Sequence, residues 1–83
     1  MTIKERIYIL YKIVSYLYDY RCEPDECLSK ELINKIKELA AKYFEPEFLS
    51  LMMKDGDLDF IDRIEHFAFE FLEFHITILP SHL

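Results

Sequence analysis

The sequence contains very little glycine or proline: one Gly, three Pro and no Trp occur in 83 residues. The single glycine, Gly56, cannot form a glycine-rich phosphate loop, and no Ser, Thr or Cys stands in a motif with an orienting base. We therefore expect a protein that is not an enzyme. Nothing in the composition indicates a linker, and residues 1–83 are predicted to form a single domain.

Long apolar runs are also lacking, since no segment approaches the roughly 20 apolar residues that cross a bilayer. The first apolar run is interrupted by Lys12, and no small-residue cleavage site follows it. We predict a cytoplasmic protein without a membrane partner, in the host cytoplasm if the protein is viral. Ten Ile against one Val, with no Gln, are typical of an AT-rich genome or a hyperthermophile.

Only two cysteines are present, Cys22 and Cys27, with four residues between them in a predicted turn. Two alternatives stay open for them: a local disulfide or two free thiols. Structural zinc needs four ligands, and His66, His75 and His82 lack the paired spacing of a zinc finger. The sequence therefore predicts no metal and no cofactor.

Positive charge is scarce in the second half of the chain. Residues 1–42 carry eight basic and seven acidic side chains, whereas residues 43–83 carry two basic and nine acidic ones. The net charge of −6 therefore belongs to the second half. Because nucleic-acid affinity depends on Lys and Arg, this distribution argues against nucleic acid and favours a basic protein as the partner.

Apolar residues recur with a helical period throughout the chain. Thr2 and Glu5 form a capping-box pattern, Ser29 and Asp57 are predicted N-caps, and Gly56 ends the third helix. We predict an all-α fold, an up-and-down bundle of three long helices and one short helix. The predicted helices cover about residues 3–20, 30–44, 46–53 and 58–75.

One aromatic residue falls on the polar side of the last predicted helix. Phe69 follows Asp62 and Glu65 on that side and precedes Glu73 by one turn. A large aromatic side chain framed by carboxylates is typical of a binding hot spot with a charged rim. The alternative is that a further helix or a second copy of the chain covers Phe69.

The first predicted helix is apolar around most of its circumference and rich in tyrosine. A domain of this size leaves much apolar surface exposed, and self-association would cover it. Tyrosine suits such an interface because its ring is large and its hydroxyl tolerates water. We therefore predict a homodimer that uses Tyr8, Tyr11, Tyr16, Tyr18 and Tyr20.

Together these patterns favour a non-catalytic, acidic protein-binding module of the inhibitor, immunity, antitoxin or viral antagonist type. It would dock the acidic side of the last helix on a basic partner. Two alternatives remain. The first is a self-assembling structural or accessory protein of a virus or mobile element, and the second is a dimeric nucleic-acid-binding regulator that uses the lysines of helix 30–44.

Overall fold

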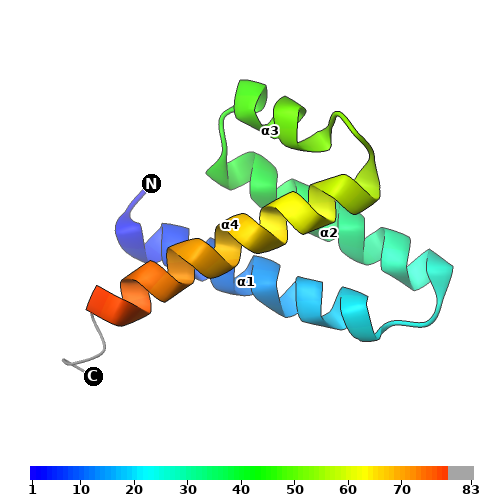
Figure 1. The fold of residues 1–83 in the computed structure, drawn as a ribbon, viewed down its shortest axis with the longest axis horizontal. Helices are drawn as coiled ribbons and strands as arrows, with labels where there is room; N and C mark the ends of the chain where they lie inside the picture. The colour runs from blue at the N-terminus through cyan, green and yellow to red at the C-terminus, as the bar shows by residue number, and fades with distance from the viewer. Residues whose placement is uncertain (79–83) are drawn as a thin grey trace.

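The computed structural model describes the backbone of residues 1–78 and the side chains of residues 1–71. Within these residues there are four helices and no strand: α1 (Ile3–Cys22), α2 (Glu26–Tyr43), α3 (Pro46–Met53) and α4 (Asp57–Ile78). The predicted all-α fold of three long helices and one short helix is confirmed. In Figure 1, α1 and α2 form an antiparallel pair, α4 runs diagonally across this pair, and α3 lies at one edge.

The start of α1 follows the predicted capping box. The Thr2 hydroxyl accepts a hydrogen bond from the Glu5 backbone N–H at 3.2 Å, and the Glu5 carboxylate accepts one from the Thr2 N–H at 3.4 Å. These bonds satisfy two backbone donors that a helix start otherwise leaves open. α3 begins at Pro46, which tolerates the first helical position because its missing N–H is not needed there.

The predicted start of α2 was wrong by four residues. The Asp25 carboxylate accepts hydrogen bonds from the N–H groups of Cys27 at 2.8 Å and Leu28 at 3.1 Å, so Asp25 and not Ser29 is the N-cap. Ser29 lies inside the helix. The physical reason is Pro24, which keeps the preceding residue extended and places the first good capping side chain directly after the turn.

Both predicted ends of α4 also need correction. Asp57 is the first helical residue rather than the N-cap. Gly56 precedes it with a φ of 102°, a conformation that residues with a Cβ rarely adopt, and its carbonyl accepts the Phe60 N–H at 3.0 Å. The helix continues to Ile78, past the predicted end at residue 75. β-Branched residues lower helix propensity only slightly, and no Gly or Pro occurs between Asp57 and Pro80.

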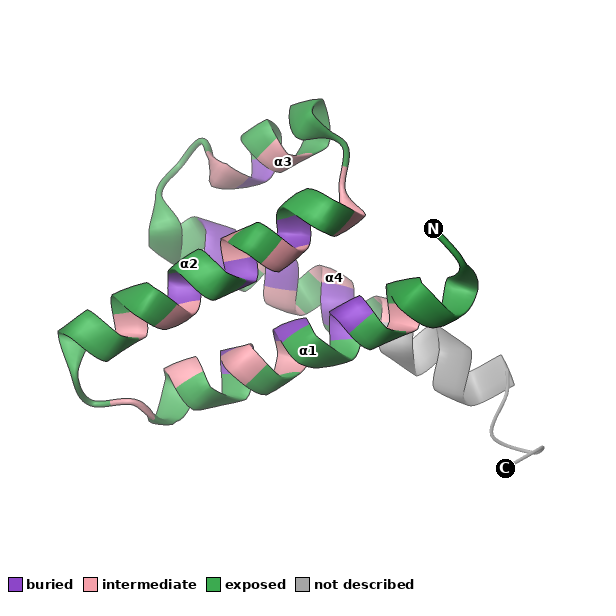
Figure 2. Cartoon of the chain, turned by 180° about the vertical axis from the view of Figure 1, so that it is seen from behind, coloured by how far each residue is buried: buried purple, intermediate pink, exposed green. Residues whose placement is uncertain are grey.

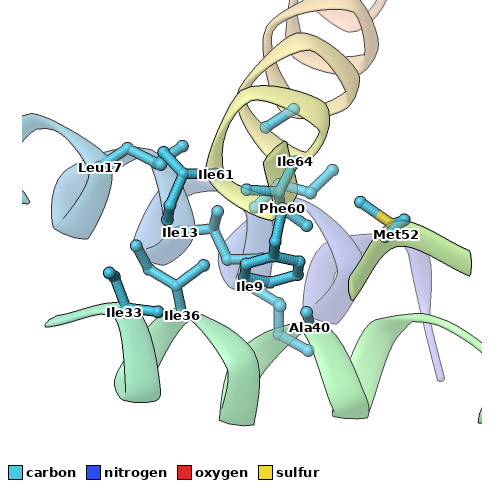
Figure 3. Close-up of a cluster of buried hydrophobic side chains, with 12 residues drawn as sticks. Ile9, Ile13, Leu17, Ile33, Ile36, Ala40, Met52, Phe60, Ile61 and Ile64 are labelled. Atoms are coloured by element: carbon cyan, nitrogen blue, oxygen red, sulfur yellow. The ribbon is translucent and has the colours of Figure 1, made fainter. Parts of the chain in front are cut away.

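The core contains apolar side chains from all four helices, and no described polar or charged residue is buried. Phe60 is 0% exposed, and its ring points from α4 toward α1 and α2 (Figure 3). Its packing fixes which side of α4 faces outward. The buried residues are Ile9, Leu10, Ile13, Leu17, Ile33, Ile36, Ala40, Met52, Phe60, Ile61, Ile64 and Ala68.

Candidate functional site

The core contacts of α4 determine which of its side chains reach the solvent. Phe60, Ile64 and Ala68 are buried, and the helical rotation of about 100° per residue turns Phe69 away from them. Phe69 is 52% exposed and lines a shallow hollow of about 530 Å³. The structure thus brings together three predicted site residues, Asp62, Glu65 and Phe69, in one patch. We call this patch the α4 acidic face, and it consists of Asp62, Glu65, His66, Phe69 and Glu70.

An arginine from α1 reaches this face. The Arg21 guanidinium contacts Asp62 at 3.1 Å and both carboxylate oxygens of Glu65 at 3.3 Å. These hydrogen bonds, to Glu65 and then to Asp62, raise the pKa of Arg21 above its usual value. Sequence reasoning missed this arginine because it lies 41 and 44 residues from its partners. The face is therefore partly neutralised, because one guanidinium group contacts two of its carboxylates.

The remaining members of the face lie one turn apart on α4. His66 Nε2 is 3.2 Å from a carboxylate oxygen of Glu70, and both side chains are exposed. This contact becomes an ion pair when the imidazole is protonated. Glu73, the fourth residue predicted for partner binding, lies within α4, but its side chain falls outside the described residues.

The five tyrosines predicted for self-association separate into two groups. Tyr16 and Tyr20 are partly buried and pack against the core. Tyr8, Tyr11 and Tyr18 are exposed on the outer side of α1. This division follows from the rotation of α1, whose buried side faces both α2 and α4. A contact between copies of the chain stays a prediction for the exposed group.

Two lysines lie close to this tyrosine surface. Lys12 Nζ is 5.8 Å from the centre of the Tyr8 ring, and Lys35 Nζ is 5.6 Å from the centre of the Tyr16 ring. Both are cation–π contacts, which hold an ammonium group over an aromatic face. Lys35 belongs to α2, so its contact with Tyr16 also connects the two helices.

The two cysteines lie at either side of the turn between α1 and α2. Cys22 is the last residue of α1, and Cys27 lies in the first turn of α2. Both are exposed and unpaired in the structure. A disulfide between them under oxidising conditions stays a prediction. Within the described part of the chain, no group of three or more His, Cys, Asp and Glu side chains is arranged to hold a metal ion.

A second concave surface, which the sequence did not predict, lies between α3 and α4. This groove of about 420 Å³ is mostly apolar. Arg63 attaches α3 to α4 because it donates hydrogen bonds to the carbonyls of Leu51 at 3.1 Å and Met52 at 3.2 Å and also pairs with Asp55. The groove is lined by Phe48, Leu51, Met52, Lys54, Arg63, His66, Phe67 and Glu70.

Comparison with known protein families, curated proteins and solved structures finds no match to this chain. In the part of the chain that the structure describes, no helix has the length and apolar character needed to span a membrane. Any proposal about function therefore depends on the geometry of the surfaces described above.

Proposed function

We propose that this chain is a non-catalytic protein-binding module that docks its α4 acidic face on a basic protein surface, in the manner of inhibitors, immunity proteins, antitoxins or viral antagonists. The observation that carries this proposal is Phe69, which is 52% exposed among carboxylates on a helix whose opposite side is buried in the core. An exposed aromatic side chain with a charged rim is the usual composition of an interface hot spot.

The packing of α4 supports this role. Phe60, Ile64 and Ala68 hold the helix against the core, so Phe69 is presented on a fixed backbone. This chain then loses little conformational freedom when a partner binds. More of the free energy gained from burying apolar surface therefore appears as affinity. Removal of a hot-spot side chain of this kind typically costs about 2 kcal/mol, which is about 30-fold in Kd.

The charges around Phe69 favour a basic partner. Arg21 holds Asp62 and Glu65, and their side chains remain partly exposed, so each carboxylate keeps room for a second cation. Glu70 adds a further exposed carboxylate. Attraction between this rim and Lys or Arg on the partner would speed association and make its rate fall with added salt.

Affinity capture with matched variants tests this proposal. Tagged wild-type protein, Phe69→Ala and Phe48→Ala are each incubated with lysate of the source organism, and the affinity of the captured protein is then measured with purified components. Phe48 is the matched control because it is also a half-exposed phenylalanine, 46% exposed, but lies on α3 outside the α4 acidic face. We expect Phe69→Ala to lose about 30-fold in affinity and Phe48→Ala to change little.

The opposite ranking would assign binding to the groove between α3 and α4. Equal affinity of wild type and Phe69→Ala would contradict the proposed role of the α4 acidic face. Far-ultraviolet circular dichroism of each variant establishes that the helices are intact before affinities are compared.

A further inference from the structure

The side of the molecule opposite α4 carries a hollowed surface of its own. Two adjoining hollows of about 360 and 320 Å³ lie between α1 and α2, and they share Tyr8, Leu39 and Lys42. We call this surface the α1–α2 groove. Tyr16 also lines it, with Lys35 close to its ring. The groove therefore offers aromatic and aliphatic contacts of the kind that accept a phenylalanine side chain.

The charges of the α1–α2 groove are opposite to those of the α4 acidic face. The lining residues of the groove include four lysines against two glutamates, a net charge of +2: Lys4, Lys12, Lys35, Lys42, Glu5 and Glu38. The α4 acidic face has three carboxylates against Arg21, a net charge of −2 when His66 is neutral. The same chain therefore contains both an acidic surface around the exposed Phe69 and a basic hollow.

These two surfaces cannot meet within one molecule. Figure 1 shows α4 in front of the α1–α2 pair, and Figure 2, from behind, shows the outer side of α1 and α2 with mostly exposed residues. A contact between the two surfaces must therefore join different copies. Because the two surfaces lie on opposite sides of the molecule, one pair of copies cannot make both contacts at once. Such an interface is therefore heterologous and produces a ring or an open chain of copies rather than a closed two-fold dimer.

We propose that the basic partner of the α4 acidic face is the α1–α2 groove of a second copy, so that copies associate head to tail. This inference rests on the proposed function, because it uses the same Phe69 surface. Phe69 of one copy would enter the hollow beside Tyr8, Tyr16 and Leu39 of the next, and the lysines around that hollow would face the carboxylates around Phe69. A specific interface buries about 500 Å² on each partner at the least, about a twelfth of the 5991 Å² surface of this chain.

Mixing two complementary variants tests this arrangement. Phe69→Ala removes the exposed aromatic side chain and leaves the groove intact, whereas the double variant Lys35→Glu, Lys42→Glu reverses two groove charges and leaves Phe69 intact. We expect wild-type protein to form species larger than the 10.1 kDa monomer as concentration rises, and these species to dissociate in high salt. Each variant alone should stay monomeric in sedimentation velocity.

An equimolar mixture of the two variants should form a heterodimer and no larger species. The Phe69 surface of the double variant can still enter the groove of Phe69→Ala, and each of the two chains then lacks the other working surface. If the same surface of both copies formed the interface instead, mixing the two variants would not restore association. The charge-matched control is Lys30→Glu, Lys54→Glu, which changes two exposed lysines outside the groove and should assemble like wild type.

Three results would overturn this inference. They are a wild-type protein that stays monomeric up to about 1 mM, assembly that persists in both variants, and variants that fail to pair when mixed. The affinity capture experiment separates this failure from failure of the proposed function. If the wild-type protein stays monomeric but captures another protein through Phe69, only the head-to-tail association is refuted. If the wild-type protein neither self-associates nor captures another protein, both proposals are refuted.

Discussion

Two neighbouring apolar residues of α4 should differ sharply in their effect on stability. Phe60 is 0% exposed at the centre of the core, whereas Leu58, two residues earlier, is 71% exposed. A domain of 83 residues has a total unfolding free energy of about 4 to 12 kcal/mol. Phe60→Ala should lower the unfolding free energy by about 3 to 5 kcal/mol, which is enough to unfold a domain at the lower end of that range. Phe60→Leu retains most of the apolar volume and should cost about 1 to 2 kcal/mol.

Urea denaturation and thermal denaturation, both followed by circular dichroism at the helical band, measure the two effects. For a domain of this size, a loss of 1 kcal/mol lowers the melting temperature by about 4 to 8 °C, so Phe60→Leu should melt about 4 to 16 °C below wild type. Leu58→Ala should change the unfolding free energy by less than about 0.5 kcal/mol. Equal shifts for the two variants would refute the assignment of the buried side of α4, and with it the outward position of Phe69.

Three further predictions concern the attachment of α3, the start of α2 and the response to acid. Arg63→Gln should lower the unfolding free energy by about 1 to 2 kcal/mol and speed amide hydrogen exchange in α3, because α3 loses its hydrogen bonds to α4; unchanged exchange would contradict the attachment. Asp25→Ala should cost about 1 kcal/mol in urea denaturation and Ser29→Ala clearly less, and the reverse order would restore Ser29 as the cap. The hydrogen bond from Arg63 lowers the pKa of Asp55 below its usual value, so this contact stabilises the fold above about pH 4 and is lost as the pH falls through the folded-state pKa. The unfolding free energy of Asp55→Asn should therefore fall less steeply with acid than that of wild type, and parallel curves would count against this pair.

The local structure of this chain was predictable because it depends on residues that are close in sequence. The capping box of Thr2 and Glu5, the start of α3 at Pro46 and the apolar periodicity of the long helices each involve contacts within one or two turns. The start of α2 was mispredicted for a local reason as well. Two good caps, Asp25 and Ser29, compete there, and Pro24 favours the first one.

The candidate functional surfaces were only partly predictable. The sequence determined that Phe69 lies on the polar side of its helix, because the helical period alone fixes that position. It did not determine whether another segment covers this side, and only the packing of α4 over α1 and α2 leaves Phe69 exposed. The same packing decides which tyrosines of α1 are exposed.

The charges of the molecule were also only partly predictable from the sequence. Net charge and the acidic second half follow from the sequence, since they are sums over residues. The contacts of Arg21 with Asp62 and Glu65 join residues more than 40 positions apart, and the lysines around the α1–α2 groove come from two helices. Such contacts depend on how whole helices pack against one another. The period of α4 predicts its acidic side, but no periodicity along the chain encodes the basic groove between α1 and α2 or the contact of Arg21 with the acidic side, so these belong to the folded structure alone.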